Sequence, residues 1–225
     1  MASIASVILE VADPAAADRF HTTAFGPGGQ VRPRASEAPT TGFRGFTLSL
    51  VVSRPAGVDA LVGAAVDAGA TTLKPAAGSL WGYGGVVRAP DGTVWQIASS
   101  SKKDTGPATR RIDEIVLLLG VEDVRASKRF YADRGLAVAK SFGGKYVEFA
   151  AGPGAVKPAL YKRRGLAKVA GVSPDGTGSH RLVVAGDAGA FTEPDGFAWE
   201  TAAPEPADRP TADGARSPAE GRSAT

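Results

Sequence analysis

The sequence has 225 residues, enough for one large domain or two small ones. Its 43% hydrophobic and 22% charged residues are typical of a globular protein rather than a disordered or fibrous one. Cysteine is absent, which excludes disulfides, thiolate metal ligands and a cysteine nucleophile, and a formal net charge of +3 predicts no nucleic-acid partner. Because no apolar run approaches the roughly 20 residues that span a bilayer, and no basic leader opens the sequence, we expect no membrane partner and a cytoplasmic location.

The first half of the sequence predicts a strand, a helix, several more strands and a second helix. The apolar run SVILEVAD leads into a helix that Asp13 can cap and that has proline at its first position. The run GFTLSLVVS predicts a further strand, and apolar residues spaced along one face predict a helix over residues 58–70. This half ends on APDGTVWQIA, a Pro-Asp-Gly turn that leads into a strand containing tryptophan.

The second half repeats these features in the same order. The run DEIVLLLGVED leads into a helix that Asp123 can cap, strands are predicted around KYVEFA, KPALYK and SHRLVVAG, and the half ends on EPDGFAWE. We expect an α+β fold in which curved sheets carry helices on one face. The predicted domains are residues 1–99 and 110–203, joined by a linker over residues 100–109. Residues 204–225 have no large apolar side chain and are predicted to form a disordered tail.

The phrases ILEVADPAAADRF, DAGATTLKPAAGSLWGYGGVVRAPDGTVWQIA, VEDVRASKRFYADRGL and FTEPDGFAWE resemble the vicinal oxygen chelate superfamily. This is the group of glyoxalases, bleomycin-resistance proteins and extradiol dioxygenases. The resemblance implies tandem domains, each of two paired βαβββ modules whose curved sheet forms a cup around a small molecule, often over a divalent metal. The second half lacks a counterpart of the helix at residues 58–70, so its last module is truncated. A homodimer, or close pairing of the two domains, could complete that cup.

The resemblance also implies where metal ligands would lie. In the first domain these positions fall on Ser6, Phe46 and Gln96, which do not form a metal site, so we expect no cofactor there. In the second domain they fall on Glu114, His180 and Glu200. Two carboxylates and one imidazole suit Fe(II), Mn(II), Ni(II) or Zn(II), and such an ion could polarise a substrate carbonyl. Glu114 or Glu200 could alternatively be the catalytic base.

Other interpretations of these residues remain open. His180 can be a hydrogen-bonded strand residue, and Glu114 can be a solvated strand end. The first cup can be filled by its own side chains, or it can bind a flat ligand at Phe46, Trp81, Tyr83 and Gln96, with Trp81 and Tyr83 stacking on it.

Two further features are a histidine in the first helix and a basic segment. His21 lies beside Phe20, a predicted core residue, and is expected to have no chemical role. The basic segment KPALYKRRGLAK is interpreted as a solvated loop, with an anion-binding rim over the second cup as the alternative.

The predicted function is metal-dependent small-molecule chemistry of the lyase, isomerase or dioxygenase type in the second cup. The alternative is metal-free binding of a small molecule, as in drug sequestration, resistance or ligand sensing.

Overall fold

A computed structural model describes residues 2–80, 82–104 and 106–202. In chain order its strands are β1 (Ile4–Val11), β2 (Val31–Ala35), β3 (Thr40–Gly42), β4 (Phe46–Val51), β5 (Thr71–Ser79), β6 (Gly82–Arg88), β7 (Val94–Ser99), β8 (Glu114–Val121), β9 (Val138–Phe142), β10 (Tyr146–Phe149), β11 (Lys157–Lys162), β12 (Gly176–Gly178), β13 (Leu182–Gly186), β14 (Phe191–Thr192) and β15 (Ala198–Thr201). Its helices are α1 (Pro14–Phe25), α2 (Pro55–Asp67), α3 (Val124–Ala132) and α4 (Arg163–Ala170). The predicted α+β class is confirmed.

The helix starts follow the predicted capping chemistry. Asp13 accepts a hydrogen bond from the Ala16 amide at the start of α1. Asp123 accepts from the Arg125 and Ala126 amides at the start of α3. These bonds satisfy amide groups that have no partner inside the helix. No helix lies between β13 and β14, so the truncation predicted for the last module is present in the described chain.

The sheets combine strands from both halves of the sequence. The eight-stranded sheet has the order β5-β6-β7-β4-β8-β11-β10-β9, and the five-stranded sheet has the order β14-β15-β13-β1-β2. In each sheet the first strands of two modules pair antiparallel, β4 with β8 and β1 with β13. The cups therefore differ from the expectation that each half closes its own sheet. Within its own module, each first strand pairs with only one other strand, so its second edge is open to a strand of any other module. Sequence order alone does not decide which of these edges pair.

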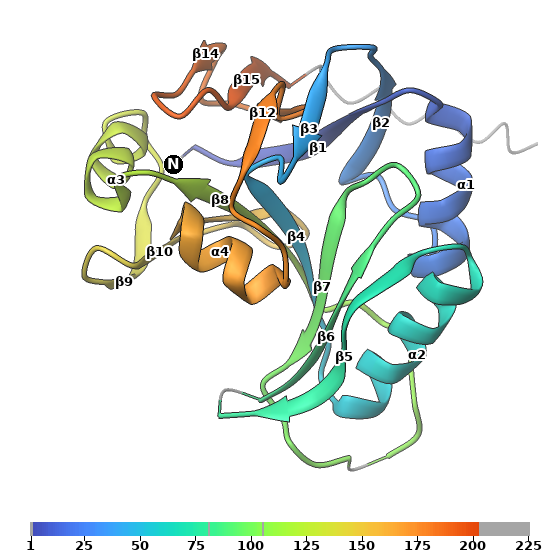
Figure 1. Ribbon diagram of the computed structural model, residues 1–225. Coiled ribbons are helices and arrows are strands. Elements are labelled where there is room, and N and C mark those ends of the chain that lie inside the picture. The colour runs from blue at the N-terminus through green and yellow to red at the C-terminus, as the bar shows by residue number, and fades with distance from the viewer. Residues whose placement is uncertain (1, 81, 105, 203–225) are drawn as a thin grey trace, which may run out of the picture.

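The eight-stranded sheet is covered on both faces because its side chains alternate between them. Leu48, Trp95 and Leu117 belong to the main core, which they share with residues of α1, α2 and α3. On the opposite face, Val116 and Leu118 pack with residues of α4. Figure 1 shows α4 in front of β8 and β4, with α1 and α2 together at the right. One helix of the same chain thus occupies part of the face where a cup would receive a ligand.

Helix α4 corrects the interpretation of the basic segment as a solvated loop. Residues 157–162 form β11, and Leu166, Ala167 and Ala170 of α4 are fully buried. The helix ends at Gly171, whose φ of 76° is a left-handed conformation that glycine adopts without strain. Lys162, Arg164 and Lys168 remain exposed.

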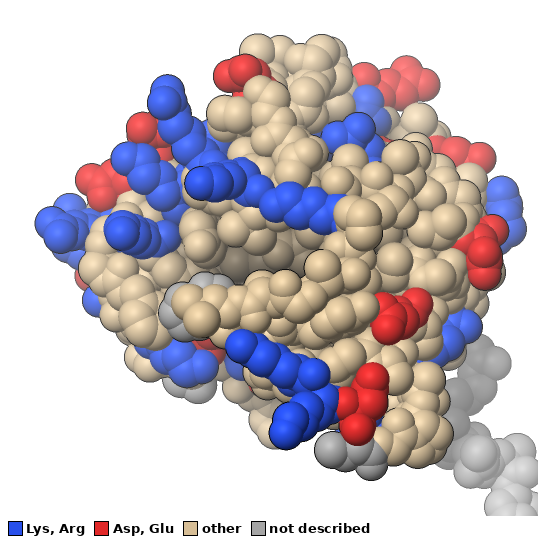
Figure 2. Space-filling model, turned by 60° about the horizontal axis from the view of Figure 1, so that its bottom comes forward, with Lys and Arg blue, Asp and Glu red and all other residues tan. Residues whose placement is uncertain are grey.

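The face shown in Figure 2 carries Lys and Arg side chains at its left edge and along one margin of a hollow. These charges give that margin of the hollow a positive character. No helix of the described ranges is both long and apolar enough to cross a membrane.

Glu193 makes the stability of this fold depend on pH. Glu193 is 2% exposed, and desolvation of its carboxyl group together with nearby Asp195 raises its pKa to about 7. The folded protein therefore binds this proton more tightly than the unfolded chain, and stability falls as pH rises from about 4.5 towards 7.

We expect Glu193→Gln to stabilise the protein by about 2 kcal/mol at pH 8 and to have little effect at pH 5, because glutamine cannot ionise. Urea unfolding at the two pH values measures this difference, and Glu37→Gln, at an exposed position, is the control. Parallel pH profiles for the wild type and Glu193→Gln would contradict the prediction.

Candidate functional site

A cavity of about 900 Å³ lies between the C-terminal end of α1 and the inner strands β7, β4, β8 and β11 of the eight-stranded sheet. Its walls come from α1, β4, β7, β8 and two loops, residues 26–30 and 151–155. Both loops are rich in glycine and proline, and Gln30 Nε2 donates a hydrogen bond to the Gly154 carbonyl, 3.1 Å away. The cavity is therefore built from segments that are far apart in the sequence.

Aromatic rings form one side of the cavity. The Trp95 ring lies 4.7 Å from the Phe25 ring and 5.4 Å from the His21 ring, measured between centroids. Trp95 is only 2% exposed, whereas Phe25 is half-buried. Aliphatic Leu50 and Ile115 also line the cavity. Such a surface suits a flat apolar group.

His21 brings an unusual buried polar group to this wall. Neither ring nitrogen makes a hydrogen bond to a described residue, and Nε2 lies 3.9 Å from Asp91 Oδ2, which also has no hydrogen-bond partner there. Burial lowers the pKa of His21, against the opposing effects of Asp91 and Asp18. The imidazole is therefore neutral near pH 7.

Four charged side chains line the rest of the cavity. Lys157 Nζ lies 2.8 Å from Glu114 Oε2, and Asp113 Oδ1 lies 3.5 Å from Arg111 Nε. Arg110 Nη2 donates to the Thr23 and Ala24 carbonyls at the end of α1, at 2.6 and 2.5 Å. The cavity thus combines an aromatic wall with a charged margin.

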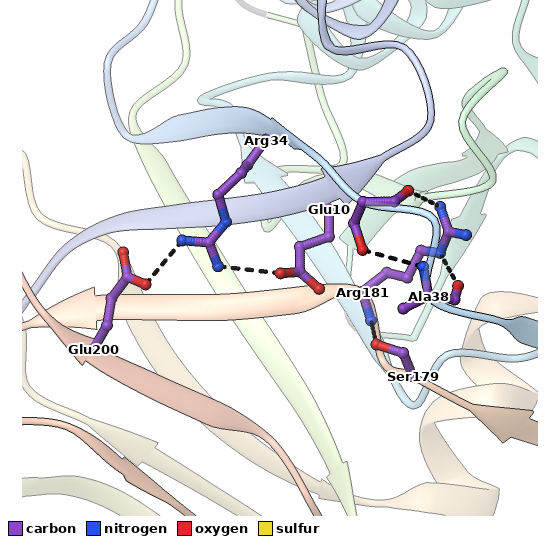
Figure 3. A network of polar contacts seen from close by, with 7 residues as sticks. Glu10, Arg34, Ala38, Ser179, Arg181 and Glu200 are labelled. Carbon is purple, nitrogen blue, oxygen red and sulfur yellow. Dashed lines mark hydrogen bonds and ion pairs between the residues drawn. The ribbon is translucent and has the colours of Figure 1, made fainter.

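The three residues predicted as metal ligands are held by different partners. Glu114, at the start of β8, pairs with Lys157. Glu200, on β15, pairs with Arg34, which also binds Glu10 at 3.1 Å (Figure 3). Glu114 lies in the eight-stranded sheet, whereas Glu200 lies in the five-stranded sheet.

His180 lies just before β13, between two backbone carbonyls. Its Nδ1 is 2.5 Å from the Arg44 oxygen, and its Nε2 is 2.9 Å from the Asp195 oxygen. The imidazole stacks on Phe197 at a centroid distance of 4.1 Å. Both nitrogens are therefore directed at carbonyl groups, in agreement with the interpretation of His180 as a hydrogen-bonded residue.

These residues do not form a metal site. Across the described ranges, no group of three or more His, Cys, Asp and Glu side chains lies close enough to hold an ion. Both carboxylates already have cationic partners, and a metal would have to displace carbonyl contacts from both sides of His180. The predicted ligand set Glu114, His180 and Glu200 thus does not fit a bound ion.

The described residues predicted to bind a flat ligand in the first cup contact other parts of the protein. Phe46 is 2% exposed in the main core. Gln96 donates to Thr47 Oγ1 at 2.7 Å, and the Tyr83 hydroxyl donates to Asp59 of α2 at 2.9 Å. Trp81 lies outside the described residues. Ser6, one of the three first-domain positions where no metal site was expected, lies on β1 in the other sheet.

Sequence reasoning missed the residues that line the cavity. Trp95 was expected only on the strand that follows the Pro-Asp-Gly turn, and His21 was expected to have no chemical role. One signal was present: His21 shares the buried stripe of α1 with Ala17, Phe20 and Ala24. A histidine on such a stripe needs either a partner or a cavity. Nothing local indicated Arg110, which lies in an exposed connecting segment.

Comparison with known proteins supports the fold. No protein-family model matches the sequence, and no curated protein is significantly similar to it. Glyoxalase I from Zea mays has a similar structure, with a TM-score of 0.58, 13% identity and coverage of 88% of this chain and 91% of that chain. A candidate dioxygenase from Bacillus subtilis has a TM-score of 0.50 at 13% identity, covering 86% of this chain and 71% of that one. The chain therefore has the vicinal oxygen chelate fold.

Proposed function

We propose that this chain binds a planar aromatic small molecule in the cavity beside Trp95 and Phe25. The supporting observation is the cavity itself, because about 900 Å³ lies within the range of roughly 300–1,000 Å³ that is typical of small-molecule sites. Its aromatic wall provides stacking surfaces, and its charged margin can orient a polar substituent. The proposed role is capture of a ligand, as in sequestration or sensing.

Metal-dependent chemistry at Glu114, His180 and Glu200 is the less favoured function. Its support is the resemblance of the sequence and the glyoxalase I fold. The separate partners of the three residues argue against it. We therefore place the binding function in the cavity and assign no reaction step to a metal.

Titration of the intrinsic tryptophan fluorescence with two-ring aromatic compounds tests this proposal. We expect saturable quenching, because the ligand would contact Trp95. Phe25→Ala is expected to weaken binding about tenfold, since an aromatic pair contributes about 1 kcal/mol beyond the area it buries. Phe142→Ala is the matched control, because Phe142 is 64% exposed and does not line the cavity. Absence of saturable quenching by naphthalene carboxylate and carboxamide would refute the proposal.

A further inference from the structure

The charges of the cavity point to the chemical class of its ligand. Asp113 and Glu114 each have a cationic partner, Arg111 and Lys157. Arg110 has no acidic partner within 4.0 Å among the described residues, and its guanidinium donates to the backbone carbonyls of Thr23 and Ala24. Among the charged side chains that line the cavity, Arg110 is therefore a cation without an acidic side chain as its partner in the described ranges.

The position of Arg110 suits recognition of an anionic group beside the aromatic wall. Its two bonds to Thr23 and Ala24 use Nη2, which leaves the N–H groups of Nε and Nη1 for another acceptor. Those carbonyls immediately precede Phe25, so the guanidinium is anchored beside the aromatic wall. Because both two-donor edges of an arginine guanidinium include Nη2, each remaining N–H group can donate one charge-assisted hydrogen bond to a carboxylate oxygen.

We infer that the cavity selects an aromatic carboxylate, with its ring against Phe25 and Trp95 and its carboxylate bound by Arg110. This inference rests on the proposed binding function and specifies the ligand class. The partial negative charge at the C-terminal end of α1 reduces the field of Arg110 but leaves its free N–H donors in place. The opposite class, an aromatic amine, would have to break the ion pairs of Glu114 or Asp113 to gain a carboxylate partner.

Calorimetric titration of the full chain with three probes of similar size tests this class. The probes are naphthalene-2-carboxylate, naphthalene-2-carboxamide and 2-naphthylmethylamine. We expect the carboxylate to bind about tenfold more tightly than the carboxamide at low salt, and this preference to shrink at high salt. We expect the amine to bind most weakly. Because all three probes are compared on the wild-type protein, the result does not depend on whether a variant folds.

Substitution then assigns the preference to one side chain. Arg110→Gln is expected to remove the preference for the carboxylate and to leave the affinity for the carboxamide unchanged. The matched control is Arg19→Gln, which removes an exposed arginine of α1 away from the cavity and should preserve the preference.

The outcomes distinguish this inference from the proposed function. Equal binding of carboxylate and carboxamide, tighter binding of the amine, or a preference that persists in Arg110→Gln would overturn the carboxylate assignment while binding in the cavity stands. Failure of all three probes to bind would overturn the proposed function itself.

Discussion

The His180→Ala variant is expected to lose about 2 kcal/mol of unfolding free energy. The substitution removes two partly buried polar contacts, between Nδ1 and the Arg44 carbonyl and between Nε2 and the Asp195 carbonyl. An imidazole with one N–H donates to only one of these carbonyls, a hydrogen bond that contributes about 1 kcal/mol net, and loss of the stack on the fully buried Phe197 adds to the cost. His180 thus joins the segment before β4 to the turn before β15.

Urea unfolding at pH 7 measures this effect. Glu114→Gln is a suitable comparison, because Glu114 was predicted to share a metal site with His180 but forms only a partly exposed ion pair. Loss of such a pair costs about 1 kcal/mol or less. A His180→Ala variant as stable as the wild type would show that these contacts do not hold the fold together.

The features that sequence reasoning predicted correctly are local. Asp13 and Asp123 cap their helices because their side chains accept from amides only two or three residues ahead. The turns at Asp91 and Asp195 lead into β7 and β15 as expected, because glycine at position 92 or 196 adopts positive φ. Each of these features depends on a few neighbouring residues, so a short stretch of sequence is enough to indicate it.

The candidate site could not be predicted in the same way because it depends on long-range pairing. The ligand positions counted along the sequence assume that each half of the chain forms one cup. Pairing of β4 with β8 instead places Glu114 in the eight-stranded sheet and Glu200 in the five-stranded sheet. The cavity brings Phe25 together with Trp95 and Arg110, and no spacing in the sequence indicates that contact. The predicted tail at residues 204–225 lies outside the described residues.

Filling the cavity is expected to have the largest effect on ligand binding. Ala155 lines the cavity on the loop between β10 and β11 and is half-buried, so a larger side chain there can occupy ligand space without entering the main core. We expect Ala155→Trp to weaken binding of naphthalene-2-carboxylate at least thirtyfold, about 2 kcal/mol, while unfolding free energy changes by less than about 1 kcal/mol. Ala151→Trp, on the same loop, provides a second test. Ala139→Trp, on the exposed strand β9, is the control.

Calorimetric titration of these variants tests most directly whether the cavity beside Trp95 is the binding site. The predicted result is tight, saturable binding to the wild type and to Ala139→Trp in the presence of a metal chelator, and loss of binding in Ala155→Trp and Ala151→Trp. Undiminished binding in both cavity-filling variants, or binding that disappears when the chelator is added, would contradict a metal-independent site in this cavity.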